Sequence, residues 1–362
     1  MADPITKVEP IVLRIPFDDG GSGRGITPTR WRNLDIVLVR VETQGGIVGW
    51  GEAFGYMCQN ATAIAVRDLV APAVVGRDSE DPRAVNLAAQ QALALFGRYG
   101  ITVVAISGLD IALWDIAAKR AGISLASLLG EQKRESVRAY ASMVRYGHVE
   151  RVEHFAAEAS SLGYDEVKLH EVADNTISAG RRGAGDQAKL TVDVNCQWSL
   201  GDVRAMLPVL QRNRVDWLEE PTFPPEDPGP WRDIAKEGIA IAAGENACTA
   251  VEFSRLIPAL DIVQPSVTKV GGVTEFLKVA EATAAAGKRL APHTPYFGPG
   301  YWASLQLAAA LEQYEVFEFL YVKPDAWCGL AAPQPIDGVI PIPTAPGIGF
   351  EPDLDVVSRF RV

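Results

Sequence analysis

The stretch from Val167 to Asn246 decides the fold of this chain, and it contains the motifs VKLHE (167–171), LTVDVNCQW (190–198), DWLEEP (216–221) and IAAGEN (241–246). Asp193, Glu219 and Glu245 lie at equal intervals of 26 residues (193, 219 and 245), which is about the length of one strand, one helix and two short loops. Each acid follows a short apolar run, which indicates a buried parallel strand. We therefore expect the three carboxylates to converge at the carboxyl ends of neighbouring strands.

Converging carboxylates repel one another unless a divalent cation neutralises them, and hard oxygen ligands favour Mg²⁺ or Mn²⁺. The sequence therefore predicts a metal site formed by Asp193, Glu219 and Glu245. A single acid at the end of a strand is more often a helix cap or part of a surface ion pair. The equal spacing of three acids argues for the metal.

Length and charge exclude several classes of protein. A chain of 362 residues suits a barrel of roughly 200 to 250 residues with a second domain. The formal charge of −11 and the pI near 5.0 argue against nucleic acid and membranes as partners, since both need a basic surface. The four cysteines form no CxxC pair, and neither a signal peptide nor a long apolar run is found. We therefore expect a soluble, cytoplasmic protein.

The first 130 residues predict an α+β domain. Strand patterns cover 5–15, 35–43 and 47–53, with a turn at Gly45-Gly46, and helical periodicity covers 60–75, 82–96 and 103–121. Strands followed by helices are typical of this fold class. Between the first two strands, the segment 17–33 is rich in Gly, Asp and Arg and predicts a loop of the kind that often covers a site.

From Val137 onward, strand and helix patterns alternate. We expect strands near 138–143, 165–170, 189–194, 215–219, 239–244, 261–264, 288–292 and 315–319. Eight repeats indicate a closed barrel, although the last helix is weakly marked and a seven-strand variant stays an alternative. The tail 333–350, rich in Pro and Gly, cannot form another βα unit. The predicted domains are a capping domain (1–130), a barrel that carries the metal site (131–325) and a C-terminal segment that returns to the capping domain (326–362).

Several motifs together resemble a known family: VGWGEA (48–53), GLDIALWDIAAKRAGISLASLLG (108–130), the three acids, QPSVTKVGGVTE (264–275) and APHT (291–294). In this order they resemble the enolase superfamily, in its mandelate racemase and muconate lactonizing enzyme branch, over nearly the whole chain. The resemblance implies an α/β fold, a modified (β/α)7β TIM barrel with an N-terminal α+β capping domain. It also implies a Mg²⁺ ion that binds a substrate carboxylate and stabilises the enediolate left by α-proton abstraction. Its E-x-P pattern selects Glu219 rather than Glu220 as the metal ligand.

The resemblance also points to a catalytic base. The family commonly has Lys-x-Lys on the second barrel strand, where this chain has Lys168-Leu169-His170. Alternation along the strand puts Lys168 and His170 on one face, toward the barrel mouth. The neighbouring ammonium should keep His170 neutral and able to accept a proton. We therefore predict that His170 removes the α-proton.

On the opposite face the family often pairs a histidine with an aspartate. His293 matches the histidine, but Ser266 occupies the position of the aspartate. Without an orienting carboxylate, we expect His293 to be a weaker base and a proton donor to a leaving hydroxyl. Glu318 matches an acid that hydrogen-bonds the enediolate, whereas Lys269 matches no catalytic position.

Substrate contacts are expected from the capping domain, because its loops close over the substrate in this family. The candidates are Arg24, Arg30 and Arg32 in the 17–33 loop and Tyr56 in the stretch 54–60, with Asn195 beside the metal ligands. The polar and basic residues of both segments fit a hydroxylated substrate with one or two carboxylates better than an aromatic one.

We therefore expect a Mg²⁺-dependent or Mn²⁺-dependent enzyme that dehydrates a sugar acid to a 2-keto-3-deoxy acid. Racemisation or epimerisation, and cycloisomerisation of a sugar lactone, are alternatives within the same branch. A catalytically inactive metal-binding protein is a further alternative, because the chain departs from both base patterns of the family; three carboxylates without a cation would, however, be costly to retain. The expected partner is a small-molecule carboxylate, and the family favours homo-oligomers, either dimers or octamers.

Overall fold

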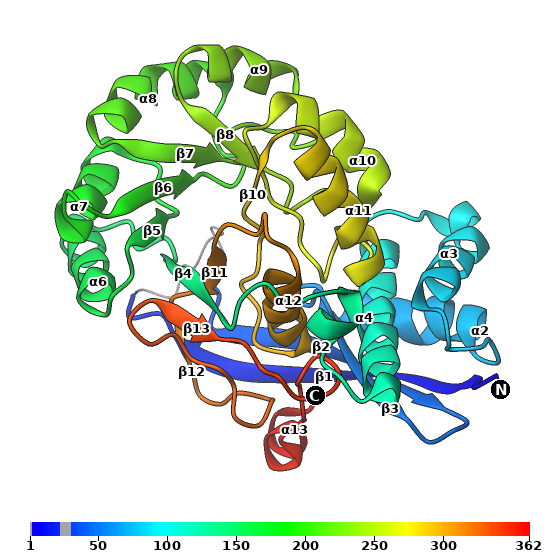
Figure 1. Ribbon diagram of the computed structural model, residues 1–362. Coiled ribbons are helices and arrows are strands. Elements are labelled where there is room, and N and C mark those ends of the chain that lie inside the picture. Colours follow the sequence, from blue (N-terminus) through cyan, green and yellow to red (C-terminus); the bar gives the residue numbers. More distant parts are fainter. Residues whose placement is uncertain (1, 22–29) are drawn as a thin grey trace.

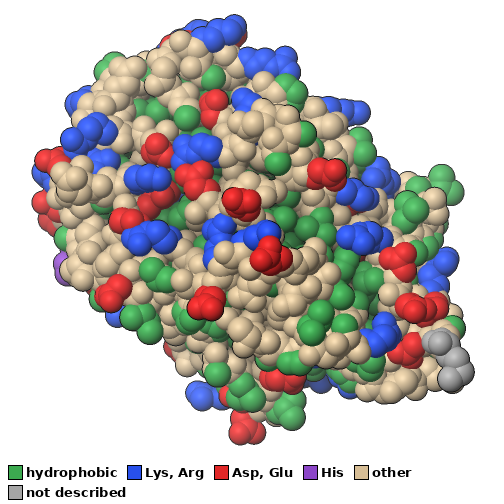
Figure 2. Space-filling view, viewed as in Figure 1, with side chains coloured by type: hydrophobic (Ala, Val, Ile, Leu, Met, Phe, Trp, Pro, Cys, Tyr) green, Lys and Arg blue, Asp and Glu red, His purple; other side chains and the backbone are tan. Residues whose placement is uncertain are grey.

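The computed structural model describes residues 2–21 and 30–362, which fold into two connected parts (Figure 1). The N-terminal third, blue to cyan in Figure 1, forms an antiparallel sheet with helices, and a parallel barrel follows it, from green to orange. On the face shown in Figure 2, acidic and basic side chains are interspersed, and neither sign forms a continuous patch.

The N-terminal sheet contains β1 (Ile5–Asp18), β2 (Asn33–Thr43) and β3 (Val48–Ala53), which pair antiparallel in this order. These strands confirm the three predicted ones. β1 runs beyond the predicted end because Pro16 still pairs with Asn33. Most alternate residues of its second half are buried, as expected for a sheet that packs on one face.

Helices cover this sheet, and the longest of them is the core of the capping part. In chain order they are α1 (Gln59–Ala65), a π-helical segment (Val66–Val70), α2 (Ala71–Val74), α3 (Pro82–Ala92), a short 3-10 helix (Ala94–Phe96), α4 (Ile101–Ala121) and α5 (Leu125–Leu129). A Cβ on Gly51 would lie 1.9 Å from the carbonyl oxygen of Gly108, so glycine lets β3 approach α4 closely. By length and composition α4 could cross a membrane, but 89% of its apolar window is buried inside the protein.

Eight parallel strands form the barrel: β4 (Ser136–Ser142), β5 (Glu166–Leu169), β6 (Lys189–Asp193), β7 (Val215–Glu219), β8 (Ala240–Ala243), β9 (Ile262–Val263), β10 (Arg289–Leu290) and β11 (Phe317–Leu320). Each pairs with the next in the chain, except at the end of the series, where β11 pairs with β4. A bridge between Leu290 and Tyr314 closes the ring beside β10.

Seven helices alternate with these strands on the outside (Figure 1): α6 (Val149–Ser161), α7 (Asp174–Ala184), α8 (Leu200–Arg212), α9 (Gly229–Lys236), α10 (Thr249–Leu256), α11 (Gly272–Ala285) and α12 (Pro299–Ala310). Within the described residues after Arg30 the order is therefore (β/α)7β, which confirms the predicted fold and excludes the seven-strand alternative. α12 is buried on almost every side, so it lacks the amphipathic pattern by which a helix is found in a sequence.

The C-terminal tail returns to the capping part. It contains β12 (Lys323–Pro324), which pairs with β1, β13 (Val339–Pro341), which pairs antiparallel with β4, and α13 (Leu354–Phe360). The last residue, Val362, donates its backbone N–H to the carbonyl oxygen of Val12. The limits of the domains at residues 130 and 325 stay a prediction.

Glu52, in β3, joins the capping part to the barrel. Its side chain is buried, and Oε2 accepts a hydrogen bond from the backbone N–H of Gly300, 2.8 Å away in the first turn of α12. No cation forms an ion pair with Glu52 among the residues from 30 to 362 or from 2 to 21. Burial raises the pKa of Glu52 to about 8 from its ordinary value of 4.5.

This shift predicts how stability changes with pH. Between pH 4.5 and about 8 the folded protein keeps a proton on Glu52 that the unfolded chain has released, so this group makes the free energy of unfolding fall as pH rises through that range. Glu52→Gln keeps an acceptor for Gly300 and cannot ionise. Its stability relative to the wild type should therefore increase between about pH 5 and about pH 8, as measured by urea unfolding. Glu80→Gln, at an exposed carboxyl, is the control, and a pH-independent difference for Glu52→Gln would contradict the assignment.

Candidate functional site

Six of the predicted site residues line one cavity at the carboxyl ends of the barrel strands, namely Tyr56, His170, Asn195, Glu245, His293 and Glu318, whereas Asp193, Glu219 and Lys168 are buried and are not part of its lining. Its volume of about 350 Å³ lies near the lower end of the roughly 300 to 1,000 Å³ found for small-molecule sites. The barrel supplies mainly polar residues and the capping part supplies mainly aromatic ones. The lining consists of Trp31, Phe54, Tyr56, Met57, Ser142, His170, Asn195, Glu245, Asn246, Lys269, His293, Pro295, Glu318 and Leu320.

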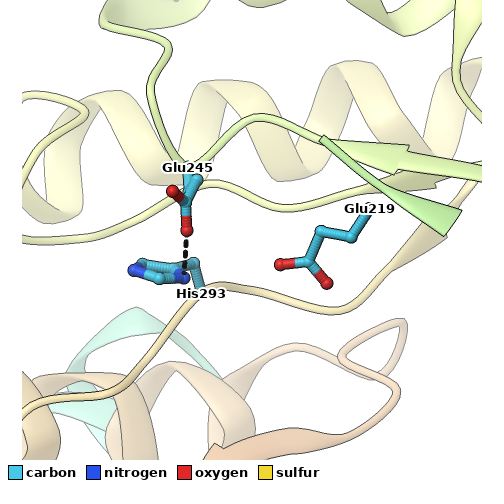
Figure 3. A group of neighbouring side chains, drawn as sticks. All are labelled: Glu219, Glu245 and His293. Carbon is cyan, nitrogen blue, oxygen red and sulfur yellow. Dashed lines mark ion pairs between the residues drawn. The ribbon is translucent and has the colours of Figure 1, made fainter. Parts of the chain in front are cut away.

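The three predicted acids come from consecutive strands. Asp193 ends β6 and Glu219 ends β7, and the two residues pair in register, so their side chains leave the sheet at the same level. Glu245 follows β8 by two residues and points toward the same space (Figure 3). Ligand atoms of Glu219, Glu245 and His293 lie within 4.8 Å of one another. The barrel therefore brings the acids together and adds His293 to them.

Lys168 lies among these carboxylates. Its ammonium is fully buried, 2.7 Å from Oε1 of Glu219, 2.7 Å from Oε1 of Glu318 and 3.5 Å from Oδ2 of Asp193. Burial alone would lower the pKa of Lys168, but the carboxylates of Glu219 and Glu318 raise it well above its ordinary value. Lys168 therefore stays charged and offsets part of the negative charge of the site. Its expected effect on His170 stays a prediction.

His170 is buried, and each ring nitrogen has a neighbour. Nδ1 lies against the carbonyl oxygen of Met143, and a carbonyl can only accept, so we assign a proton to Nδ1. Nε2 lies 3.2 Å from Oδ2 of Asp193. In the neutral ring Nε2 therefore carries the free electron pair, and the side chain lines the cavity where a substrate proton could reach it.

His293 has carboxylate partners that its sequence neighbourhood does not reveal. Its Nδ1 lies 2.8 Å from Oε2 of Glu245 (Figure 3) and 3.1 Å from Oε2 of Glu318. Burial alone would lower the pKa of His293, but these carboxylates raise it to about 9. The ring is therefore protonated at neutral pH and can donate a proton.

This contact corrects the expectation that His293 lacks an orienting carboxylate. Ser266, at the position expected to orient it, instead pairs its hydroxyl with the phenol of Tyr296. The orienting groups, Glu245 and Glu318, come from the loop after β8 and from β11. A family pattern that is read at Ser266 alone could not show them, because they approach His293 only when the barrel closes.

The donor atoms fit a divalent cation. Asp193 Oδ2 is buried and accepts no hydrogen bond from the residues described, so a lone pair is open to a ligand. Four carboxyl groups lie near two positively charged side chains, so the negative groups outnumber the positive ones. The carboxyl groups are those of Asp193, Glu219, Glu245 and Glu318, and the positive side chains are Lys168 and His293. Carboxylate oxygens suit Mg²⁺ or Mn²⁺. A set of Glu219, Glu245 and His293 is an alternative, and its imidazole would favour a transition metal.

Other side chains hold the acids in place. The backbone N–H of Asn195 donates to Oδ1 of Asp193 at 2.8 Å, which agrees with its expected place beside the metal ligands. Ser142 donates its hydroxyl to Oε1 of Glu318 at 2.7 Å. Ser142 is not among the predicted site residues, although its position at the end of the first barrel strand could have indicated it.

The capping part contributes aromatic rings to the cavity. Tyr56, a predicted substrate contact, lines the cavity and donates its hydroxyl to the carbonyl oxygen of Pro295 at 2.6 Å. Arg30 and Arg32 are exposed and are not part of the lining, and Arg24 lies outside the described residues. The expected basic wall is thus replaced, in the described chain, by the aromatic side chains of Trp31, Phe54 and Tyr56.

Comparisons with known proteins point to one family. Residues 151–356 match a model described as enolase C-terminal domain-like, and residues 26–130 match the mandelate racemase / muconate lactonizing enzyme N-terminal domain. The chain is 31% identical over 348 residues to D-galactarolactone cycloisomerase of Agrobacterium fabrum, a match that covers 90% of this chain and 91% of that protein. It is 32% identical over 296 residues to L-talarate/galactarate dehydratase of Salmonella typhimurium, which covers 79% and 73%.

Solved structures agree with these matches. A crystal structure of a racemase from Streptomyces coelicolor A3(2) with bound magnesium has a TM-score of 0.87 to this chain at 26% identity, and the match covers 99% of this chain and 100% of that chain.

Two substitutions distinguish the possible ligand sets. If Asp193, Glu219 and Glu245 hold the cation, Asp193→Asn should weaken Mg²⁺ binding by at least about tenfold, because the amide lacks the charge of the carboxylate. His293→Asn should change it by less than about threefold. Titration calorimetry with MgCl₂ measures both affinities. The opposite ranking would assign the site to Glu219, Glu245 and His293.

Proposed function

The chain belongs to the enolase superfamily, in its mandelate racemase and muconate lactonizing enzyme branch, and is an enzyme of the lyase or isomerase type; from this premise we propose that it dehydrates a sugar acid to a 2-keto-3-deoxy acid. The names of two relatives support the substrate class, since a galactarolactone cycloisomerase and a talarate/galactarate dehydratase both act on sugar acids or their lactones.

His170 is the proposed base. It accepts the α-proton at Nε2, while the proton on Nδ1 stays against the carbonyl oxygen of Met143. The C–H bond of the substrate breaks, and its electron pair remains next to the carboxylate. A divalent cation held by Asp193, Glu219 and Glu245 would supply the positive charge that stabilises this carboxylate as the proton leaves.

His293 is the proposed acid. Glu245 and Glu318 hold its Nδ1, so Nε2 carries the proton that can be transferred. When the bond between the β-carbon and its hydroxyl breaks, this proton joins the hydroxyl and water departs. The enol that is left gains a proton at the β-carbon and loses the proton of its α-hydroxyl to solvent, and so becomes the 2-keto-3-deoxy acid. Exchange with solvent then returns both histidines to their starting protonation states.

Lys168 and Glu318 act as positioning residues in this proposal. The Lys168 ammonium binds Glu219 and Glu318 at 2.7 Å each, and so it fixes one proposed metal ligand and the carboxylate that orients His293. Lys168 is not among the residues that line the cavity, whereas Glu318 is. Lys168 therefore sets the arrangement of the groups that react.

A base and an acid in one cavity are the observation that carries the proposal. His170 lines the cavity with Nε2 beside the Asp193 carboxylate, and His293 is held in its protonated form by two carboxylates. Elimination needs one group of each kind. Cycloisomerisation of a sugar lactone is the second candidate, since the cycloisomerase of Agrobacterium fabrum aligns over 91% of its length; there the ring oxygen would take the place of the leaving hydroxyl.

The expected homo-oligomer and the cytoplasmic location stay predictions, as does the choice of Mg²⁺ over Mn²⁺. The substrate class is the better supported part of the partner prediction, because the relatives named above act on small carboxylic acids or their lactones.

A screen in D₂O tests the reaction. The protein is incubated with Mg²⁺ and a panel of sugar acids and lactones, and the products are followed by NMR. We expect a 2-keto-3-deoxy acid from at least one aldonic or aldaric acid. Stereoinverted, deuterated substrate without elimination would assign a racemase or epimerase, and turnover of lactones alone would assign a cycloisomerase. Asp193→Asn is the inactive control, and a protein that binds Mg²⁺ but turns over nothing would favour the non-catalytic alternative.

Single variants of the two histidines separate their roles. His170→Ala should lower kcat by about 10² to 10⁴ and abolish deuterium exchange at the α-carbon, with Mg²⁺ affinity nearly unchanged. His293→Asn should lose the product but still exchange the α-proton, because the base is intact. His148→Ala, at an exposed histidine, is the matched control. Exchange that persists in His170→Ala and disappears in His293→Asn would invert the two roles.

A further inference from the structure

The turn between β9 and α11 places Lys269 at the boundary between the barrel and the capping part. Helix α4 fixes this turn: Ser107 Oγ accepts the N–H of Gly271 at 2.8 Å, and Asp110 Oδ2 accepts the N–H of Thr274 at 2.9 Å. A Cβ on Gly272 would lie 2.4 Å from the side chain of Asp110, so this contact requires glycine. The backbone that carries Lys269 is therefore held by the capping part.

The ammonium of Lys269 lines the cavity without a carboxylate partner. Its Nζ donates to Oδ1 of Asn246 at 3.2 Å and lies 4.8 Å from the ring centroid of Phe54, a cation–π contact that orients it. Among the residues described, no Asp or Glu oxygen lies within 4.0 Å of Lys269 Nζ, which is the limit for an ion pair. By contrast, Lys168 is paired with three carboxylates and His293 with two. An ammonium has three N–H donors, so Lys269 has donors left for a ligand.

Trp31 provides a second donor without a partner in the same cavity. Its indole is only 7% exposed, and within the described chain Nε1 has no hydrogen-bond partner. A buried donor without a partner is unfavourable, and an oxygen atom of a bound ligand would satisfy it. Trp31 packs on Tyr56 with ring centroids 5.0 Å apart, and Tyr56 packs on Phe54 at 5.3 Å. The aromatic wall therefore has a donor at each end, Trp31 at one and Lys269 at the other.

We propose that Lys269 is a specificity-determining residue that binds a second carboxylate of the substrate, so that the site prefers aldaric acids and their monolactones to aldonic acids of the same length. The preference rests on the proposed function for the reacting carboxylate, which a cation held by Asp193, Glu219 and Glu245 would bind. The Lys269 ammonium then binds the other terminal carboxylate. Trp31, at the other end of the aromatic wall, donates to a hydroxyl or ring oxygen of the same ligand.

A different role for Lys269 would give a different result. Asn246 Nδ2 lies 3.4 Å from Oε1 of Glu245, so Lys269 is linked to a proposed metal ligand through Asn246. If Lys269 served only to offset the charge of Glu245, its removal would alter the binding of every carboxylate substrate to the same extent. A terminal contact affects only ligands that carry the second carboxylate.

Matched pairs of ligands test the proposal. Titration calorimetry in the presence of Mg²⁺ compares galactarate with galactonate and glucarate with gluconate, which differ only in whether one end of the chain is a carboxylate or a hydroxymethyl group. We expect the wild type to bind at least one diacid about tenfold or more tightly than its monoacid partner. Lys269→Met, which keeps an unbranched side chain but removes the ammonium over Phe54, should remove this preference, and Lys269→Arg should retain it. Lys236→Met, at an exposed lysine of α9, should change nothing.

Several outcomes would overturn the proposal. The proposal is wrong if the wild type binds neither diacid more tightly than the matching monoacid. It is also wrong if Lys269→Met lowers the affinity for the diacid and for the monoacid equally while its thermal unfolding is unchanged. Turnover of the same ligands is assayed separately. A Lys269-dependent preference for diacids without turnover of any ligand would support the role of Lys269 and count against the proposed reaction.

Discussion

The site depends on the buried ion pairs of Lys168 with Glu219 and Glu318. Four carboxyl groups at one end of a barrel repel one another strongly where water is excluded, and the Lys168 ammonium is the fully buried charge that lies 2.7 Å from two of them. The three residues come from β5, β7 and β11, so the contact links strands that are not neighbours in the ring. Loss of one partner would leave a buried charge without compensation, which is the usual way in which such networks fail.

Different partners give the two histidines opposite properties. Both lie at the carboxyl ends of barrel strands, and both are buried. His170 has a neutral carbonyl oxygen at Nδ1 and one carboxylate, that of Asp193, at Nε2, whereas His293 Nδ1 lies against two carboxylates. A cation held by Asp193 would take up the charge of that carboxylate, so Asp193 would then stabilise the His170 imidazolium ion less. A carboxylate stabilises the imidazolium ion, and a carbonyl does so far less. The same side chain can therefore serve as base on one side of the cavity and as acid on the other.

The capping part sets the far wall of the cavity and also fixes two barrel turns. Glu52 binds the first turn of α12, in the same loop region as His293, and Ser107 and Asp110 bind the turn that carries Lys269. These contacts come from the glycine-rich strand β3 and from the core helix α4. The motifs VGWGEA and GLDIALWD thus hold the turns that carry site residues, and they do not contact the reacting groups themselves.

Local pattern in the sequence predicted the strands of the barrel, and the family resemblance implied the (β/α)7β order and the capping domain. Alternating apolar runs located all eight barrel strands, and the equal spacing of Asp193, Glu219 and Glu245 placed three acids at consecutive strand ends, because each βα unit has a nearly constant length. Only the tertiary structure decided which groups meet. Closure of the ring brings Glu318 of β11 to Lys168 and to His293, and it brings Lys269 beside Phe54 of the capping part. No periodicity within one strand encodes such contacts, since they depend on the order and stagger of strands that are distant in the chain. The sequence therefore determined which acids lie at the strand ends. Only the closed barrel determined which charged groups pair, and this pairing decides what each histidine can do.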